Sequence, residues 1–211
     1  MIKDFIESAV NRKSFTLSGY TEPYQRDWFT RVSKIMATSH TLMSRDEALH
    51  LVSAVVGTSF HTSPMAEVGV YKGGSARMMR EFDTSNRRLD LFDTFKGLPE
   101  GDGYHVPGQY RGTLDDIRGI SNSRIYKGRF EKTKKSLDPQ ERYSLVNIDV
   151  DLKVVLRDCL NFFYSRIVNK GMMVVHDYCE VTGSKRLIDE FARDHGCIVI
   201  AQSGTQCYVI P

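Results

Sequence analysis

Two groups of ionisable residues come at the ends of short apolar runs, a place from which side chains can do chemistry. Asp149 ends one run and His176-Asp177 ends the next. Because the carboxyl ends of neighbouring parallel strands meet at one edge of a sheet, these three side chains are expected to converge. Asp151, two residues after Asp149, should face the same side and support it. An imidazole beside carboxylates is suited to proton transfer, because it titrates near neutral pH.

A second imidazole, His105, lies in residues 97–112, a long segment that is rich in glycine and has no hydrophobic periodicity. Segments of this kind inside a domain are usually functional or disordered, and we interpret this one as functional. His105 and His176 are therefore alternative candidates for a general base. Asp149 is the third candidate catalytic residue.

The motif Glu67-Val-Gly-Val-Tyr-Lys-Gly-Gly-Ser75 places three glycines between an apolar run and a helical pattern. In open α/β sheets, a glycine-rich turn after the first strand lets backbone amides approach a ligand closely. The spacing Gly-x-x-x-Gly-Gly differs from the Gly-x-Gly-x-x-Gly of dinucleotide-binding turns, so a pyrophosphate site is disfavoured. We expect a different nucleotide-like cofactor. The residues predicted to bind it in this motif are Glu67, Gly69, Tyr71, Gly73 and Ser75.

Two carboxylates support this cofactor site. Asp93 ends the next apolar run, about 20 residues downstream of the glycines. An acidic side chain at this spacing can accept hydrogen bonds from ribose hydroxyls. Glu67 lies within a strand-like sequence, where an unpaired buried carboxylate is costly. A polar or cationic ligand group nearby would stabilise it.

The hydrophobic pattern predicts an α/β fold, with a doubly wound, seven-stranded and mostly parallel sheet. The strands are expected at 65–70, 88–92, 124–126, 145–150, 171–176, 197–201 and 206–210. The helices between them are expected at 75–82, 114–120, 130–136, 154–168 and 184–194. The last two strands are separated by four residues, too few for a crossover helix, so the final strand should run antiparallel at or near a sheet edge.

The N-terminal part is predicted to be a helical cap, residues 1–60, that precedes the cofactor-binding domain, residues 61–211. Residues 44–47 have the form of a helix capping box. The aromatic residues Tyr20, Tyr24 and Trp28 could form a wall over a ligand ring, although core or dimer packing is favoured.

Composition restricts the partners and the setting. The net charge is +3 and the basic residues are scattered, which argues against nucleic acid as the main partner. The four cysteines have no zinc-ligand spacing and indicate a reducing, cytoplasmic setting. The N-terminal sequence has charges within its apolar stretch, so we expect no signal peptide, and no run approaches the ~20 apolar residues of a membrane span.

Five motifs, in order, make the chain resemble the macrocin O-methyltransferase family. They are the glycine motif ending at Ser75, Phe92-Asp-Thr-Phe-Lys-Gly-Leu-Pro99, Lys127-Gly-Arg-Phe-Glu-Lys-Thr133, Ile148-Asp-Val-Asp-Leu152 and Val174-Val-His-Asp-Tyr178. The resemblance runs from about residue 64 to 195 and is looser before it. It implies a class I methyltransferase fold and S-adenosylmethionine bound by the glycine turn, with Asp93 on the ribose.

The resemblance also implies a divalent metal, usually magnesium, near the methyl acceptor. The family's metal carboxylates match Asp149 and an acidic pair that is His176-Asp177 here. Magnesium prefers oxygen ligands, whereas imidazole suits manganese, iron, cobalt, nickel or zinc. Three arrangements are open: a transition metal, magnesium held by Asp149, Asp177 and Asp151, or no metal and His176 as the base. The family's base lies in the segment that corresponds loosely to the one containing His105.

The leading interpretation is an S-adenosylmethionine-dependent O-methyltransferase that acts on a hydroxyl of a sugar or other polyhydroxylated small molecule, with or without a metal. One alternative is an iron-dependent, hydroxylase-like relative on the same fold. A second is a non-catalytic homologue that binds the cofactor only. A homo-oligomer is compatible with each of them.

Overall fold

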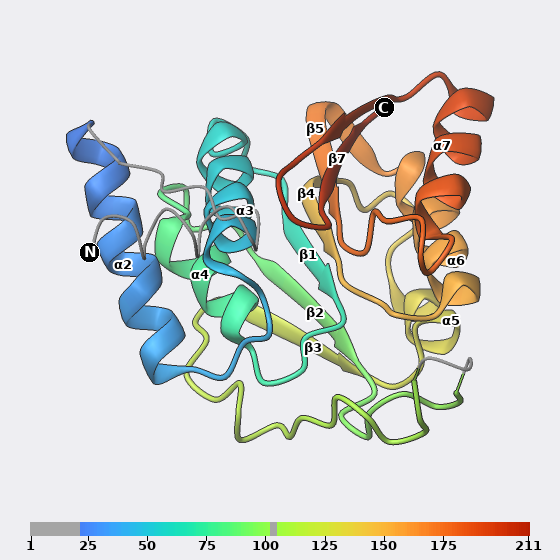
Figure 1. Cartoon of the computed structure of the whole chain (residues 1–211), viewed down its shortest axis with the longest axis horizontal. Helices are drawn as coiled ribbons and strands as arrows, with labels where there is room; N and C mark the ends of the chain where they lie inside the picture. Colours follow the sequence, from blue (N-terminus) through green and yellow to red (C-terminus); the bar gives the residue numbers. More distant parts are fainter. Residues whose placement is uncertain (1–21, 102–104) are drawn as a thin grey trace, which may run out of the picture.

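The computed structural model describes residues 22–101 and 105–211, and these form a seven-stranded sheet between two layers of helices (Figure 1). The strand order is β3-β2-β1-β4-β5-β7-β6, with β7 antiparallel to both of its neighbours and the other pairs parallel. The strands are β1 (Met65–Val68), β2 (Leu89–Asp93), β3 (Ser123–Lys127), β4 (Tyr143–Ile148), β5 (Ile167–Val175), β6 (Ile198–Ala201) and β7 (Cys207–Ile210).

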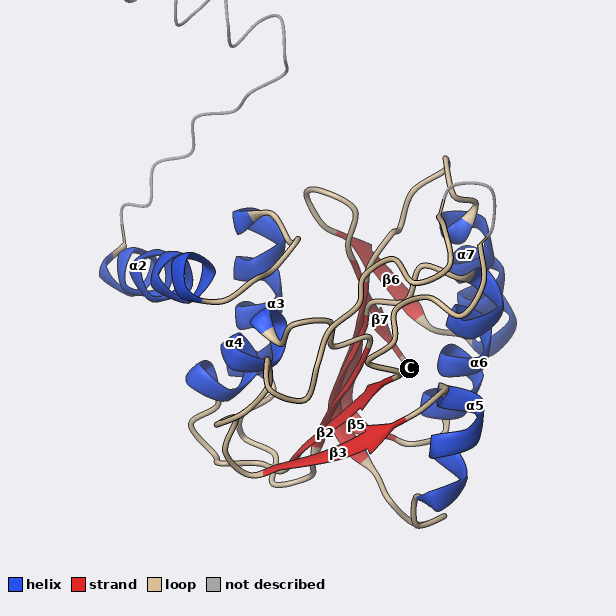
Figure 2. Ribbon diagram, turned by 90° about the horizontal axis from the view of Figure 1, so that it is seen from below, coloured by secondary structure: helices blue, strands red, loops and turns tan. Residues whose placement is uncertain are grey.

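The helices divide into two layers. Figure 2 shows α2, α3 and α4 on one face of the sheet and α5, α6 and α7 on the other. Their bounds are α2 (Pro23–Thr38), α3 (Arg45–Gly57), α4 (Gly74–Phe82), α5 (Phe130–Thr133), α6 (Lys153–Tyr164) and α7 (Ser184–His195), with the 3-10 helix η1 (Lys134–Ser136) after α5. The predicted doubly wound α/β fold is therefore confirmed.

Strand alternation divides the core between the two faces. Met65 and Leu145 pack with the α2–α4 layer, whereas Ala66 and Val146 pack with the α5–α7 layer. Both faces of β1 and β4 are fully buried, as expected for central strands covered by helices. This alternation also fixes the side of the sheet to which the polar residues of these strands point.

All seven predicted strands are present, and the residues 202–205 form the predicted hairpin between β6 and β7. The helix predicted at 114–120 is wrong. This segment forms consecutive turns, in which Thr113 and Asp116 cap one another and Gly119 has a φ of +83°. Short polar residues that bond their own backbone compete with helix formation.

The helix predicted at 154–168 is too long. α6 ends at Tyr164, and β5 begins three residues later at Ile167, which pairs with Tyr143 of β4. The β-branched residues Ile167 and Val168 fit a strand better than a helix, and the available partner strand decides the outcome.

α3 and α4 pack on the sheet directly, and α2 packs on these two helices. α3 begins with the predicted capping box, in which Ser44 and Glu47 bond each other's backbone amides. Trp28 of α2 packs against Phe82 of α4, with the ring centroids 6.2 Å apart, so it serves the core as favoured. Tyr20 lies outside the described residues, and the domain boundary at residue 60 stays a prediction. Within the described ranges, the search for a helix able to cross a membrane found none.

Candidate active site

The residues that directly follow three strands lie at one edge of the sheet. Gly69 follows β1, Asp149 follows β4 and His176 follows β5. Each still donates its backbone N–H to a neighbouring strand: Gly69 to Phe92 O (3.0 Å), Asp149 to Val68 O (2.9 Å) and His176 to Ile148 O (2.9 Å). The ladder thus extends one residue beyond the strands and fixes these positions, and the predicted convergence is observed.

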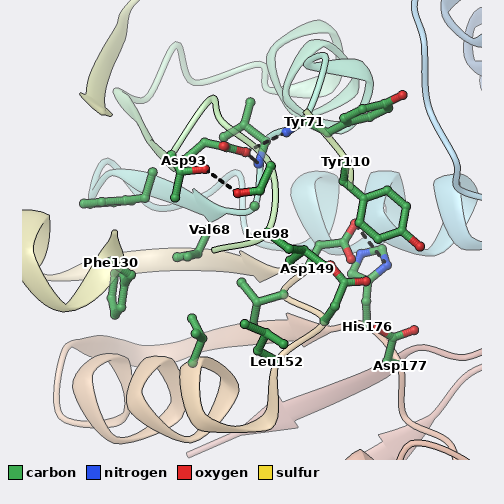
Figure 3. A pocket seen from close by; sticks show the side chains of 18 of the residues that line it. Val68, Tyr71, Asp93, Leu98, Tyr110, Phe130, Asp149, Leu152, His176 and Asp177 are labelled. Atoms are coloured by element: carbon green, nitrogen blue, oxygen red, sulfur yellow. Dashed lines mark hydrogen bonds and ion pairs between the residues drawn. The ribbon is translucent and has the colours of Figure 1, made fainter. Parts of the chain in front are cut away.

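A cavity of about 690 Å³ opens at this edge (Figure 3). Its volume lies in the range of about 300–1,000 Å³ that is typical of small-molecule sites. One part, here called the turn side, is formed by the turn 69–75, through Gly69, Val70, Tyr71, Gly74 and Ser75, and by Asp93. The other part, the acidic side, is formed by Asp149, Asp151, His176 and Asp177. Gly128 to Glu131 of the third motif and the segment from His40 to Met43 also line the cavity.

The Asp93 carboxylate holds the turn side by accepting hydrogen bonds from backbone N–H groups. Asp93 Oδ2 accepts the backbone N–H groups of Val70 (2.7 Å) and Tyr71 (2.8 Å), and Oδ1 accepts that of Phe95 (2.7 Å). An ionised carboxylate has about four acceptor positions, so one position on Oδ1 is left for a ligand hydroxyl. Asp93 therefore closes the turn as well as facing the cavity, a structural role that the sequence did not reveal.

Gly69 is required where the turn passes β4. Its φ is +87°, and a Cβ added there would lie 1.8 Å from the carbonyl oxygen of Asp149. Any other residue would push the turn away from the strand. Tyr71 itself takes a positive φ of 52°, which is uncommon for a residue with a side chain and is found preferentially at functional sites.

The acidic side concentrates negative charge. His176 Nδ1 lies 3.8 Å from Asp149 Oδ2, and His105 Nε2 lies 3.4 Å from Asp151 Oδ1. Burial and the neighbouring Asp149 raise the pKa of Asp151 to about 6. The same two causes raise the pKa of Asp177. A group that carries positive charge, or develops it, would be stabilised on this side of the cavity.

Asp177 is placed by the hairpin between β6 and β7. Its φ is 59°, in the left-handed region, and the next residue, Tyr178, donates its N–H to Thr205 O at 2.7 Å. Glu47 accepts the N–H (3.2 Å) and hydroxyl (3.0 Å) of Thr205, which connects the start of α3 to the same hairpin. The acidic side therefore depends on contacts between segments far apart in the sequence.

A row of buried polar residues lies beneath this side. Asn147 Nδ2 donates to Glu67 Oε1 (2.8 Å), Asn147 Oδ1 lies 3.1 Å from His176 Nε2, and Gln206 contacts the same imidazole. Burial raises the pKa of Glu67 to about 8, and the nearby side chains of Ser75 and Asn147 oppose this shift. Sequence reasoning singled out Glu67 but missed Asn147 and Gln206. The available signal was a polar residue inside an otherwise apolar strand.

The predicted site residues fall into three groups. Gly69, Tyr71, Ser75, Asp93, Asp149, His176 and Asp177 line the cavity. Glu67 lies beneath the wall, and Gly73 faces Ile117, against which an added Cβ would lie 2.8 Å away. His105 approaches the site through Asp151. In the described part of the chain, no three histidine, cysteine or acidic side chains are placed to hold a metal ion.

The strand order, with its antiparallel β7, is that of the class I methyltransferase fold, which is also the fold of three solved structures. The O-methyltransferase NovP is 19% identical, with a TM-score of 0.71 over 81% of each chain. The calicheamicin methyltransferase CalS11 is 14% identical (TM-score 0.65; 93% of this chain, 98% of that one). A protein from Corynebacterium glutamicum is also 14% identical (TM-score 0.60; 100% and 97%).

A family model described as a methyltransferase domain (Methyltransf_24) matches residues 66–178, more than half of the chain. The chain therefore belongs to this family and is an S-adenosylmethionine-dependent methyltransferase. The match begins in β1 and ends just after His176-Asp177, so it includes both sides of the cavity. A search of curated proteins found no match.

Proposed function

We propose that this enzyme transfers the methyl group of S-adenosylmethionine to a hydroxyl of a sugar or similar polyhydroxylated small molecule. The observation that carries the proposal is the single cavity that joins a glycine turn and Asp93 to an imidazole beside carboxylates. CalS11, which shares the fold, is described as a TDP-rhamnose 3'-O-methyltransferase. The resemblance of the five motifs to the macrocin O-methyltransferase family supports the same class of acceptor.

The turn side fits the cofactor. Gly69, Tyr71 and Ser75 line the wall, and Asp93 keeps an acceptor position for a ribose hydroxyl. Glu67 supports the wall from beneath, and Gly73 shapes the turn without facing the cavity. When bound, S-adenosylmethionine supplies an electrophilic methyl group: the acceptor oxygen forms the new bond to carbon, the carbon–sulfur bond breaks with its electron pair going to sulfur, and the hydroxyl loses a proton.

We assign His176 as the base that removes this proton from the acceptor hydroxyl. Its Nδ1 faces Asp149, which lines the same cavity and stabilises the imidazolium that forms when Nδ1 takes the proton. His105 is placed against Asp151 and orients this carboxylate. Asp149 and Asp177 are also positioned to accept hydrogen bonds from acceptor hydroxyls and so to orient them.

We derive this mechanism without a metal ion. His176 Nδ1 lies 3.8 Å from Asp149 Oδ2, so the imidazole and this carboxylate interact with each other directly. The imidazole and carboxylates can instead act through proton transfer and hydrogen bonds, which corresponds to the third of the arrangements left open by the sequence.

A turnover assay tests the proposal. The enzyme is incubated with S-adenosylmethionine and a set of sugar acceptors that starts with TDP-rhamnose, with and without EDTA, and S-adenosylhomocysteine and methylated product are followed by mass spectrometry. We expect acceptor-dependent turnover that survives EDTA and falls about 10²–10⁴-fold in His176→Ala, the range of a positioned general base. Turnover that is lost in EDTA, or that is unchanged in His176→Ala, would contradict the assignment.

A further inference from the structure

Four polar side chains form a continuous row across the middle of the sheet. Glu67 in β1 and Asn147 in β4 are register partners, His176 follows β5, and Gln206 directly precedes β7. Glu67, Asn147 and Gln206 are fully buried, and His176 is 7% exposed. All four positions alternate in phase with the residues that face α3 and α4, so the row lies on one face of the sheet.

Gln206 and Asn147 both contact the imidazole of His176, but they differ in whether they can determine which ring nitrogen carries the proton. Gln206 places its amide nitrogen 3.0 Å from Nε2 and 3.4 Å from Nδ1, so it touches both ring nitrogens of His176. Gln206 therefore cannot select the nitrogen of His176 that carries the proton.

Asn147 can select it, because its other end is anchored. Its Nδ2 donates to Glu67 Oε1 at 2.8 Å, which turns Oδ1 toward His176 Nε2 at 3.1 Å. Glu67 Oε1 accepts this bond either as a carboxylate or as the carbonyl oxygen of an acid whose proton is on Oε2, the oxygen that has no protein partner among the described residues. An oxygen that faces Nε2 requires a proton on Nε2.

We propose that Asn147, anchored by Glu67, is a positioning residue that keeps His176 protonated on Nε2 and leaves Nδ1 unprotonated, facing Asp149 and the cavity. The consequence for catalysis rests on the proposed function, in which Nδ1 takes the acceptor proton. Holding the tautomer in the resting enzyme avoids a ring flip or proton exchange before each turnover. Neither Asn147 nor Glu67 needs to touch the substrate.

Nitrogen-15 NMR of the histidine-labelled, full-length enzyme tests the tautomer directly. Near neutral pH, we expect the His176 signals of a protonated Nε2 and a bare Nδ1. In Asn147→Leu, the ring loses its fixed acceptor, and we expect a mixture of tautomers. Protonation on Nδ1 in the unchanged enzyme, or an unchanged tautomer in Asn147→Leu, would overturn the inference.

Glu67 provides a second route to the same test, which also applies if Asn147→Leu does not fold. Glu67→Met removes the anchor of Asn147 and should also give a mixture, whereas Glu67→Gln can present an oxygen to Asn147 and should keep the tautomer. Ser144→Ala is the matched control, because Ser144 is a buried polar residue of β4 that bonds Arg87 and no member of the row. Loss of the tautomer in Ser144→Ala would also contradict the proposal.

Kinetics separate this inference from the proposed function. We expect Asn147→Leu to lower kcat about 10²-fold, part of the about 10²–10⁴-fold of a positioned base, with little change in KM for S-adenosylmethionine. If the unchanged enzyme shows no methyl transfer, the proposed function fails while the NMR result still tests the tautomer. If it is active and Asn147→Leu keeps full kcat, only the positioning role fails.

Discussion

The two sides of the cavity are built by different means. The turn side comes from one short segment, residues 69–75, which is closed by backbone bonds to a single carboxylate, Asp93. The acidic side comes from the ends of β4 and β5 and is supported by Glu67 in β1, Gln206 before β7 and the hairpin at Thr205. The first is a local backbone structure, and the second is an assembly of side chains from distant segments.

Because of this difference, the two sides of the cavity tolerate different kinds of substitution. A turn made by glycine and backbone amides accepts few substitutions, but it holds any ligand of the same shape. A set of side chains can be altered one residue at a time, which changes the chemistry and the acceptor while the cofactor site stays intact. His176 stands where the resemblance to the macrocin O-methyltransferase family implies an acidic residue, and such a replacement would be a change of this second kind.

The largest expected effect concerns Glu67, which supports the acidic side from within the sheet. Its carboxyl has a pKa raised from 4.5 to about 8 in the folded protein, mainly because burial disfavours the charged form. Between these values, the unfolded chain gives up a proton that the folded chain keeps, so the free energy of unfolding falls as pH rises and levels off above about pH 8. The slope is on the order of 1 kcal/mol per pH unit.

Glu67→Gln should remove this slope, because an amide does not titrate. Urea unfolding of both proteins between pH 5 and 8 measures it, and the variant should gain relative stability as pH rises. Parallel curves for the two proteins would show that Glu67 is ionised in the folded state. The acidic side would then rest on a buried charge.

The next effect tests the backbone of the turn side. Gly69→Ala should lower the free energy of unfolding by about 3 kcal/mol, because the added Cβ would meet the Asp149 carbonyl in addition to the cost of a positive φ. Gly119→Ala is the matched control: its φ is +83°, but nothing lies within 4 Å of an added Cβ. We expect the control to lose only about 1 kcal/mol. Equal losses in the two variants would argue against the close approach at β4.

A smaller effect should separate the two roles of Asp93. Asp93→Asn keeps one oxygen acceptor but loses the charge that holds the amides of Val70 and Tyr71. We expect S-adenosylhomocysteine to bind about 10-fold more weakly by calorimetry, which corresponds to the loss of about 1.4 kcal/mol. Asp90→Asn, which changes a buried carboxylate of the same strand that bonds Tyr143 and Arg88, serves as the comparison. Binding should stay near normal in that variant.

The smallest effect lies at the edge of the acidic side. Glu47→Ala removes the capping box of α3 and the two bonds to Thr205, and should cost about 1 kcal/mol in thermal or chemical unfolding. Asp27→Ala removes only an exposed ion pair with Arg31, so it should be nearly neutral. A neutral Glu47→Ala would mean that the hairpin is held without this contact.

The sequence predicts the turn side better than the acidic side for a physical reason. Strand periodicity and the glycine motif are local, so the seven strands, the turn and the position of Asp93 could be read from neighbouring residues. The segment 114–120 was misread because its turn depends on capping by Asp116 and on Gly119 in a left-handed conformation. Helical periodicity alone does not include either effect.

The acidic side depends on register between distant strands. Convergence of Asp149 and His176 follows from parallel strand ends, and it could be predicted. The contact between Glu67 and Asn147 joins residues 80 positions apart, and it exists only because β1 pairs with β4 in one register. No local pattern contains this register, which is why Asn147 and Gln206 were missed.

The central claim is that one cavity presents the methyl group on its turn side to a base on its acidic side. A crystal structure with S-adenosylhomocysteine measures this most directly. The account predicts the ribose at Asp93 and the sulfur directed toward Asp149 and Nδ1 of His176. A ligand bound elsewhere, or with its sulfur directed away from His176, would contradict it.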